Sequence, residues 1–134
     1  MSPADAVRSV LRSYARFSGR ARRSEYWWWS LAYTVVFVAY FVLIGLLAAV
    51  AGESEPVATA AGLVYLALVA AVVVPSVAVT VRRLHDTGRS GWWYLICFAP
   101  LGGIALLVFT CMDSQQGTNV YGPSPKLPSA ATYA

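Results

Sequence analysis

Residues 26–52, YWWWSLAYTVVFVAYFVLIGLLAAVAG, contain no charged side chain. An α-helix needs about 20 predominantly apolar residues to cross the hydrocarbon core of a bilayer, so this run of 27 residues is long enough. Two further charge-free runs follow, of 26 residues at 56–81 and of 23 residues at 90–112. A charged side chain at the centre of a membrane helix costs about 2.5–3.5 kcal/mol on insertion. The three runs therefore predict three transmembrane helices, at residues 26–50, 57–81 and 92–111.

The composition of the whole chain indicates the same class of protein. Of its 134 residues, 58% are hydrophobic and 12% are charged, and the mean hydropathy is +0.59. Soluble domains carry about 25% charged residues, and a soluble fold so poor in charge would expose large apolar patches. We therefore predict an all-α membrane protein, and the composition excludes an ordinary soluble domain.

The third run is interrupted near its middle by Pro100-Leu101-Gly102-Gly103. A helix that is only kinked there crosses the membrane once. A helix that unwinds there leaves two halves of about 12–13 Å each, too short for about 30 Å of hydrocarbon, and the segment is then re-entrant. Because exposed backbone is costly in lipid, we expect the kinked crossing and keep the broken, re-entrant segment as the alternative.

All but one of the basic residues lie in two clusters in the sequence. Nine of the ten are arginines, namely Arg8, Arg12, Arg16, Arg20, Arg22 and Arg23 before the first run and Arg82, Arg83 and Arg89 after the second. The connection at 51–56 carries only Glu53 and Glu55. The positive-inside rule then places the N-terminus and the loop at 82–91 in the cytoplasm. Clusters of this kind beside apolar runs suit anionic headgroups better than a nucleic-acid groove.

The first seventeen residues have the pattern of a surface helix. Ser2 is a candidate N-cap, with Pro3 at the first helical position and Asp5 three residues after Ser2. Arginines then recur every four residues, at positions 8, 12 and 16, opposite apolar side chains. An amphipathic helix lying in the membrane interface explains this pattern. Packing of the helix on cytoplasmic loops of the same protein is the alternative.

Three polar stretches flank the apolar runs, at residues 17–27, 82–93 and 117–125. The central stretch reads Arg-Arg-Leu-His-Asp at 82–86, followed by Gly88 and the pair Trp92-Trp93. In this order, with apolar helices between them, the stretches resemble the domain-of-unknown-function 805 family over residues 14–125. The family's last motif commonly reads Gly-Pro-Asp-Pro, whereas this chain has Ser124 in place of the acid. The resemblance implies a small protein of the bacterial inner membrane and implies no activity.

The polar stretches supply the candidate functional residues. On the cytoplasmic face we expect an ion-pair network or a headgroup site built from Arg20, Arg22, Arg23, Glu25, Arg82, Arg83, His85, Asp86, Gly88, Trp92 and Trp93. The tail motif consists of Gly117, Asn119, Tyr121, Gly122, Pro123 and Pro125. Glu25 is expected to pair with Arg82 or Arg83, and Asp86 with Arg20 or Arg22. A network that closes the loops is the favoured reading, and headgroup binding by the same residues is the alternative.

The sequence does not predict an enzyme. His85 is the only histidine, whereas a metal hydrolase needs three or more ligands, so we expect neither a metal nor a cofactor. The predicted spans lack the charged residues that ion-coupled carriers place in the membrane. We instead expect a structural or interaction protein whose basic face binds anionic lipid or another membrane protein. A homo-oligomeric channel or transporter component is the alternative.

The chain divides into a cytoplasmic segment at 1–25, a membrane domain at 26–111 and a polar tail at 112–134. The tail is rich in Gly, Pro, Ser and Gln and has no apolar periodicity. We expect it to form a loop and to be disordered beyond Pro125. The side of the membrane on which it lies depends on whether the third run crosses.

Overall fold

A computed structural model describes residues 2–126, and within this range every regular element is a helix. The elements in chain order are α1 (Pro3–Arg12), α2 (Arg23–Ala51), α3 (Glu55–Asp86), the 3₁₀-helix η1 (Gly91–Phe98) and α4 (Gly102–Cys111). The predicted all-helical fold is therefore confirmed. The last part of the predicted tail, from residue 127 on, lies outside the described residues.

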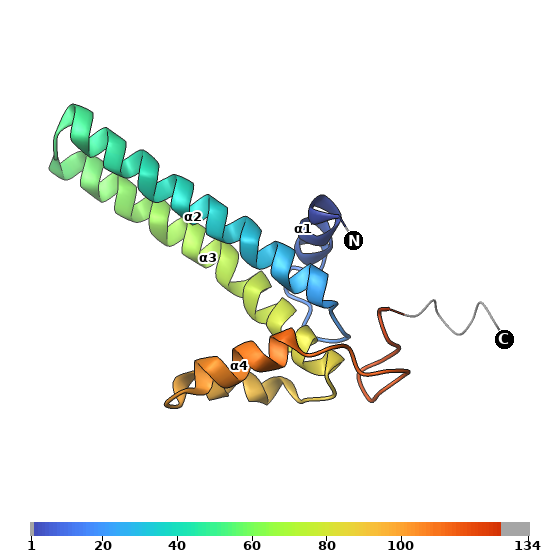
Figure 1. Cartoon of the computed structure of the whole chain (residues 1–134). Coiled ribbons are helices and arrows are strands. Elements are labelled where there is room, and N and C mark those ends of the chain that lie inside the picture. Colours follow the sequence, from blue (N-terminus) through green and yellow to red (C-terminus); the bar gives the residue numbers. More distant parts are fainter. Residues whose placement is uncertain (1, 127–134) are drawn as a thin grey trace.

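Helices α2 and α3 form a long antiparallel hairpin (Figure 1). With 29 and 32 residues they are about 44 and 48 Å long at 1.5 Å per residue. Both are long and apolar enough to cross a membrane, and their most apolar stretches are not buried inside the protein. Val50, for example, is 88% exposed. Such a surface fits hydrocarbon rather than water.

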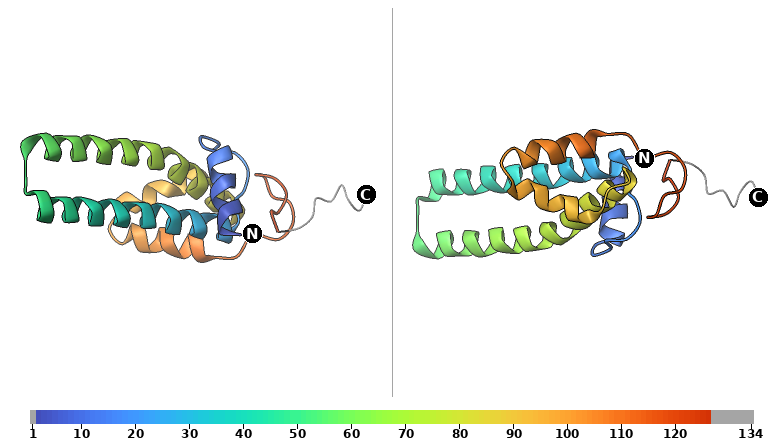
Figure 2. Two further views of the ribbon diagram at one scale, coloured as in Figure 1. Left: turned by 90° about the horizontal axis from the view of Figure 1, so that it is seen from above. Right: turned by 90° about the horizontal axis from the view of Figure 1, so that it is seen from below.

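The third apolar run is not a single helix. It is divided into η1 and α4, which run antiparallel to each other and return the chain to the end from which it came (Figures 1 and 2). The two parts measure about 16 Å and 15 Å, given 2.0 Å per residue in a 3₁₀-helix and 1.5 Å in an α-helix. The expectation of one kinked helix at 92–111 is thus wrong, and the broken segment is the form observed.

The residues at the break explain why the chain reverses there. Pro100 has no N–H and disfavours helical backbone in the residue before it, and Ala99 is extended at ψ 154°. Leu101 adopts the left-handed conformation, with φ 61°. Gly102 then lies so close to the carbonyl oxygen of Ile96 that an added Cβ would overlap it. Glycine at this position is therefore required for the close approach of α4 to η1.

Helix α1 begins as predicted and ends earlier than predicted. The Ser2 hydroxyl accepts a hydrogen bond from the Asp5 N–H at 3.2 Å, which confirms Ser2 as the N-cap. The helix ends at Arg12 instead of continuing to residue 17. Ala6 and Val10 are buried, and Val10 packs in a small core with Trp29. One face of α1 is thus covered by the protein's own helices.

Helix α3 continues through Pro75, which is buried. Proline has no N–H, so the carbonyl group of Ala71, four residues earlier, has no donor within the helix. The Tyr14 hydroxyl, from the segment after α1, donates to this carbonyl oxygen at 2.6 Å. A residue 57 positions away in the sequence therefore satisfies the carbonyl that the proline leaves free.

The molecule has two unlike ends, which we call the base and the tip. The base is the end where α1, residues 13–25, residues 82–90 and residues 112–126 meet, and the tip is the turn between α2 and α3 at residues 52–54 (Figure 1). The small buried core, formed by Val10, Ala21, Trp29 and Val79, lies near the base. The polar stretches singled out in the sequence are all found there.

Candidate functional site

The candidate site is a buried polar cluster at the base, which we call the base network. It is built around Arg20, Glu25, Arg82, Arg83, His85 and Asp86. These residues come from the loop before α2, the first turn of α2 and the last turns of α3. All three polar stretches contribute to it, because the third run folds back and brings the tail to the same end of the molecule (Figure 2).

Asp86 lies at the centre of the base network. Its Oδ1 accepts a hydrogen bond from Arg20 Nε at 2.9 Å, and its Oδ2 accepts one from Arg83 Nη1. The Ser114 hydroxyl donates to the same Oδ2 at 2.5 Å. The side chains of Asp86 and Arg20 are 0% and 1% exposed. A buried carboxylate needs such partners, since removing one leaves an uncompensated charge in the interior.

Arg20 also holds the tail in place. Its Nη1 donates to the carbonyl oxygens of Gly117 at 2.8 Å and Gly122 at 3.3 Å. Its Nη2 donates to the carbonyl oxygens of Gln115 at 2.5 Å and Asp86 at 3.2 Å. One guanidinium group therefore satisfies carbonyl groups from both the end of α3 and the tail, as its planar set of donors allows.

The tail motif also contacts the end of α3 directly. Asn119 Nδ2 donates to the carbonyl oxygen of His85 at 3.0 Å. The ring of Tyr121 stacks on the ring of His85, with centroids 3.9 Å apart and an interplanar angle of 0°. His85 Nδ1 lies 3.0 Å from the carbonyl oxygen of Gly19 and carries the proton, because a carbonyl only accepts. The second and third polar stretches thus form one unit.

Glu25 and Arg82 form the second buried ion pair. Arg82 Nη1 donates to Glu25 Oε1 at 3.0 Å, and the Ser9 hydroxyl of α1 donates to the same oxygen at 3.1 Å. The side chains of Arg82 and Glu25 are 5% and 6% exposed. Arg82 Nε and Nη2 are buried and have no acceptor among the described residues. This pair joins α1, α2 and α3 at the base.

Arg83 joins the base network to the end of α4. Its side chain is fully buried, and its Nε donates to the carbonyl oxygen of Thr110 at 3.1 Å. Its Nη2 donates to the carbonyl oxygen of Met112 and its Nη1 to that of Ala21 at 3.3 Å. The last carbonyl groups of a helix lack partners within it and favour a nearby cation. Arg83 therefore caps α4 and fixes its return to the base.

Gly88 ends α3. It has φ 79°, which favours glycine, and its N–H donates to the carbonyl oxygen of His85 at 3.0 Å. The next N–H, of Arg89, donates to the carbonyl oxygen of Leu84 at 2.9 Å, which completes a Schellman motif. A Cβ at position 88 would also meet the Gln115 side chain at 2.5 Å. This turn sets the direction in which η1 leaves α3.

The other predicted residues lie at the edge of the base network or outside it. Arg22 Nε donates to the carbonyl oxygen of Pro125 at 2.6 Å. Arg23 is exposed and lies 3.7 Å from the Asp113 carboxylate. Trp92 and Trp93, at the start of η1, are 80% and 47% exposed and take no part in the network. Pro123 is exposed as well.

Asp113 and Ser124 lie at the rim of the base network. The Lys126 ammonium group and the Ser114 N–H, both of which donate to the Asp113 carboxylate, lower the pKa of Asp113 below its ordinary value. Ser124, which stands where the family motif commonly has an acid, is buried at 6% exposure. The neutral hydroxyl at this position avoids burying a further charge.

The structure thus resolves which of the candidate pairs form. Glu25 pairs with Arg82, and Asp86 pairs with Arg20 and also with Arg83. The guanidinium groups of Arg20, Arg82 and Arg83 are turned toward protein atoms and are nearly inaccessible. This arrangement favours a network that closes the loops over a headgroup site made from the same residues. No group of three metal-binding side chains occurs in residues 2–126.

The sequence did not single out several members of the site. Ser9, Ser114 and Gln115 all bond to the base network, and Tyr14 bonds to α3. Ser9 lies on the edge of α1 beside the face formed by the buried Ala6 and Val10, so helical spacing is a weak signal for it. Nothing in the sequence marks Ser114 or Gln115, because a hydroxyl or a backbone carbonyl in a polar tail is ordinary.

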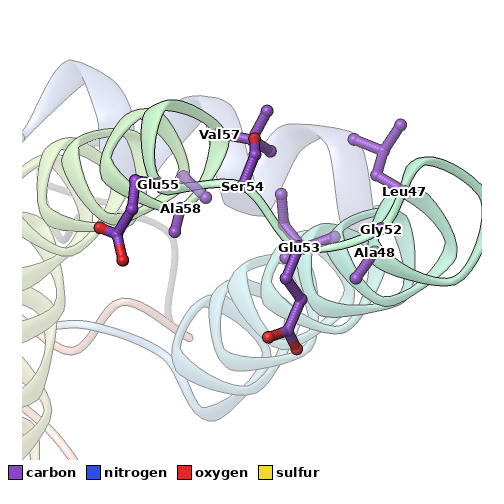
Figure 3. A pocket seen from close by; sticks show the side chains of 10 residues that line it. Leu47, Ala48, Gly52, Glu53, Ser54, Glu55, Val57 and Ala58 are labelled. Carbon is purple, nitrogen blue, oxygen red and sulfur yellow. The ribbon is translucent and has the colours of Figure 1, made fainter.

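A recess at the tip lies far from this chemistry (Figure 3). It has a volume of about 540 Å³ and is walled by apolar side chains of α2 and α3, including Leu47, Ala48 and Ala58. Glu53 and Glu55 lie at its rim. It contains none of the residues of the base network.

Comparisons with known proteins agree with the membrane character of the chain. A family model described as "Protein of unknown function (DUF805)" matches residues 14–123. Inner membrane protein YhaI of Escherichia coli (strain K12) is 41% identical over 122 residues, which cover 90% of this chain and 95% of that protein. Inner membrane protein YhaH of the same strain is 40% identical over 119 residues, 88% and 93% of the two chains. No solved structure matches the chain.

Proposed function

The chain belongs to the DUF805 family and is an integral protein of the bacterial inner membrane, and from this premise we propose that it binds anionic phospholipids through the exposed arginines of its base. The proposal has two parts. The first is the orientation of the molecule in the membrane, and the second is the separation of its arginines into two groups.

The orientation follows from the distribution of charge. The ten basic residues all lie before residue 26 or after residue 81, at the base, whereas the tip carries only Glu53 and is followed by Glu55 at the start of α3. The positive-inside rule places such a base in the cytoplasm. In this orientation α2 and α3 cross the membrane, while η1 and α4 enter it from the cytoplasmic side and return. Both ends of the chain are then cytoplasmic.

The single observation that carries the function is the separation of the arginines. Arg20, Arg82 and Arg83 are buried and neutralised by carboxylates. Arg8, Arg12, Arg16 and Arg23 are exposed. Among the described residues, Arg12 and Arg16 have no ion pair, and Arg8 and Arg23 have only exposed ones, with Asp5 at 3.8 Å and with Asp113 at 3.7 Å. The exposed group is therefore available for a ligand, and the buried group is not.

The cytoplasmic leaflet supplies such a ligand. Its anionic lipids attract basic side chains near the surface by about 1 kcal/mol for each arginine. Exposed charges interact over roughly 8–10 Å at physiological ionic strength and are screened by added salt. Binding is thus expected to depend on headgroup charge and to weaken in salt.

The test uses the purified full chain in a mild detergent. Phosphatidylglycerol is expected to raise the thermal midpoint more than phosphatidylcholine with the same acyl chains, because a ligand that binds only the folded state stabilises it. The difference is expected to shrink in 0.5 M salt, where the Debye length is only about 4 Å, and in the variant R8Q/R12Q/R16Q. Equal stabilisation by the two lipids at low salt contradicts the proposal.

A further inference from the structure

Helix α1 presents three different surfaces around its axis. Successive residues are about 100° apart, so the buried Ala6 and Val10 define an inner face. Arg8 and Arg12 project from the opposite, outer face, and both are exposed. Val7 and Leu11 lie on one edge between these faces, and Ser9 lies on the other. The arginines therefore divide an apolar edge from a polar edge.

Each edge is a shallow, open surface formed by α1 and its C-cap alone, and Arg8 and Arg12 border both surfaces. The apolar surface, which we call the trough, is lined by Pro3, Ala4, Val7 and Leu11 together with the two arginines. The polar surface is lined by Asp5, Ser9 and Ser13 together with the same two arginines. An apolar surface and a set of hydroxyl groups thus meet at one pair of cations.

Two hydrogen bonds tie α1 and the residues after it to the spans. Tyr14, two residues beyond the end of α1, donates to the carbonyl oxygen of Ala71, about 15 Å along α3 from Val81 at 1.5 Å per residue. Ser9, on the polar edge, bonds to Glu25 in the first turn of α2. The polar edge therefore contacts the base, and the chain that leaves α1 reaches toward the middle of the spans. Helix α1 itself runs across the ends of α2 and α3 (Figure 2).

From this arrangement we propose that the outer face of α1 is a binding site for one anionic phospholipid. The site gives the proposed function a definite location and rests on it. Arg8 and Arg12 hold the phosphate, to which guanidinium groups can donate two parallel hydrogen bonds. An acyl chain lies in the trough along Val7 and Leu11.

The neighbouring groups determine how the two arginines share the phosphate. Asp5 lies 3.8 Å from Arg8 and accepts a hydrogen bond from the Ser2 hydroxyl at 2.6 Å. Its charge partly compensates Arg8, so Arg12 makes the stronger contact with the phosphate. The Ser9 hydroxyl already donates to Glu25, which leaves the Ser13 hydroxyl to donate to a phosphate oxygen. The occupant is a membrane lipid rather than free phosphate, because free phosphate leaves the trough empty.

The test measures the dissociation constant of one phosphatidylglycerol molecule from the purified full chain by native mass spectrometry. The variant R8Q/R12Q is expected to weaken binding about 30-fold, from the loss of about 1 kcal/mol for each arginine. The matched control R89Q/K126Q removes the same charge from the base, at positions outside α1 where Arg89 lies over the Phe109 ring and Lys126 pairs with Asp113, and is expected to change binding less than about 3-fold. Leu11→Ser keeps both cations and is expected to weaken binding several-fold by making the trough polar.

The outcomes separate the site from the general function. If R89Q/K126Q weakens binding as much as R8Q/R12Q, the site is refuted while the attraction of the basic base for anionic lipid stands. If the unchanged protein binds phosphatidylcholine as tightly as phosphatidylglycerol, both proposals fail. Inorganic phosphate is expected not to displace the lipid at equal concentration, and displacement contradicts a role for the trough. Thermal midpoints of all variants within a few degrees of the unchanged protein show that folding is intact.

Discussion

The base and the tip of the helical hairpin are held together in different ways. At the base, α2 and α3 are joined by the buried pair Glu25–Arg82, and the surrounding chain converges on Asp86. Toward the tip, the two helices are joined by aromatic rings around Tyr65, which lies about 6.0 Å from Phe37 and Tyr40, centroid to centroid. The last turns carry exposed apolar side chains such as Val50.

This difference shows where the fold acquires its specificity. Lipid is as apolar as a leucine side chain, so the hydrophobic effect does not bring two membrane helices together. The tip therefore needs only to be apolar, and many sequences satisfy that requirement. The base must match donors to acceptors and cations to carboxylates in the interior, where each unmatched group is costly. Substitutions are thus expected to have large effects at the base and small ones toward the tip.

The largest effect is expected for Asp86→Asn. This change leaves the buried Arg20 and Arg83 without their carboxylate, and breaking a buried pair costs about 3–5 kcal/mol. The free energy of unfolding, measured by titrating the detergent-solubilised protein with sodium dodecyl sulfate, is expected to fall by that amount. Asp113→Asn removes an exposed carboxylate from the rim of the same region and is expected to have no measurable effect. Equal losses in the two variants contradict the contrast.

The next effect concerns the fold-back of the third apolar run. Gly102→Ala introduces a methyl group that overlaps the Ile96 carbonyl oxygen and is expected to destabilise the protein by about 1–3 kcal/mol. Gly103→Ala meets nothing within 4 Å and is expected to be neutral or to stabilise α4 by up to about 1 kcal/mol. The same titration distinguishes the two variants. Similar behaviour of both shows that η1 and α4 do not approach each other as described.

A smaller effect is expected where the base and the spans meet. Tyr14→Phe removes the side-chain donor that takes the place of the missing Pro75 N–H at the Ala71 carbonyl oxygen, and an unsatisfied carbonyl in an apolar setting costs about 1–2 kcal/mol. Pro75→Ala restores an N–H four residues after Ala71. In the Pro75→Ala background, Tyr14→Phe is therefore expected to cost less than about 0.5 kcal/mol. A double-mutant cycle measures the coupling, and additive effects argue against this bond.

The smallest effect is expected toward the tip. Tyr40→Phe removes a hydrogen bond of 2.5 Å from the Tyr40 hydroxyl to the Ala61 carbonyl oxygen. That carbonyl keeps its regular donor within α3, so the expected loss is about 0.5 kcal/mol. The unfolding titration compares it directly with Asp86→Asn. A loss of unfolding free energy as large as that of Asp86→Asn contradicts the comparison, because contacts toward the tip would then be as important for the fold as those at the base.

The sequence predicted the spans better than their polar ends. The charge-free runs located α2 and α3, but both helices extend into charged residues, α2 from Arg23 and α3 to Asp86. A count of charges finds where hydrocarbon is tolerated and does not find where the helix stops. Cap chemistry decides that point, and at the end of α3 it is the conformation of Gly88.

The sequence predicted which residues make up the base network, but it did not predict which of them pair with each other. The sequence placed Glu25 and Asp86 near arginines, but it did not choose between Arg82 and Arg83, because that choice depends on how α3 is rotated against α2. The break at Pro100 was visible, yet the cost of exposed backbone favoured a continuous crossing. The cap that Arg83 gives to the end of α4 favours the fold-back instead. It joins Arg83 to residues that lie 27 and 29 positions later in the sequence, and such a contact cannot be read from the sequence.

The most direct test of this account is the location of both ends of the chain in cells. A fluorescent reporter that folds only in the cytoplasm and a phosphatase that is active only in the periplasm are each fused to the N-terminus and to the C-terminus of the full protein. The fold-back of η1 and α4 predicts fluorescence and no phosphatase activity at both ends. Phosphatase activity at the C-terminus, with fluorescence at the N-terminus, means that the third run crosses the membrane, and the base described here does not form.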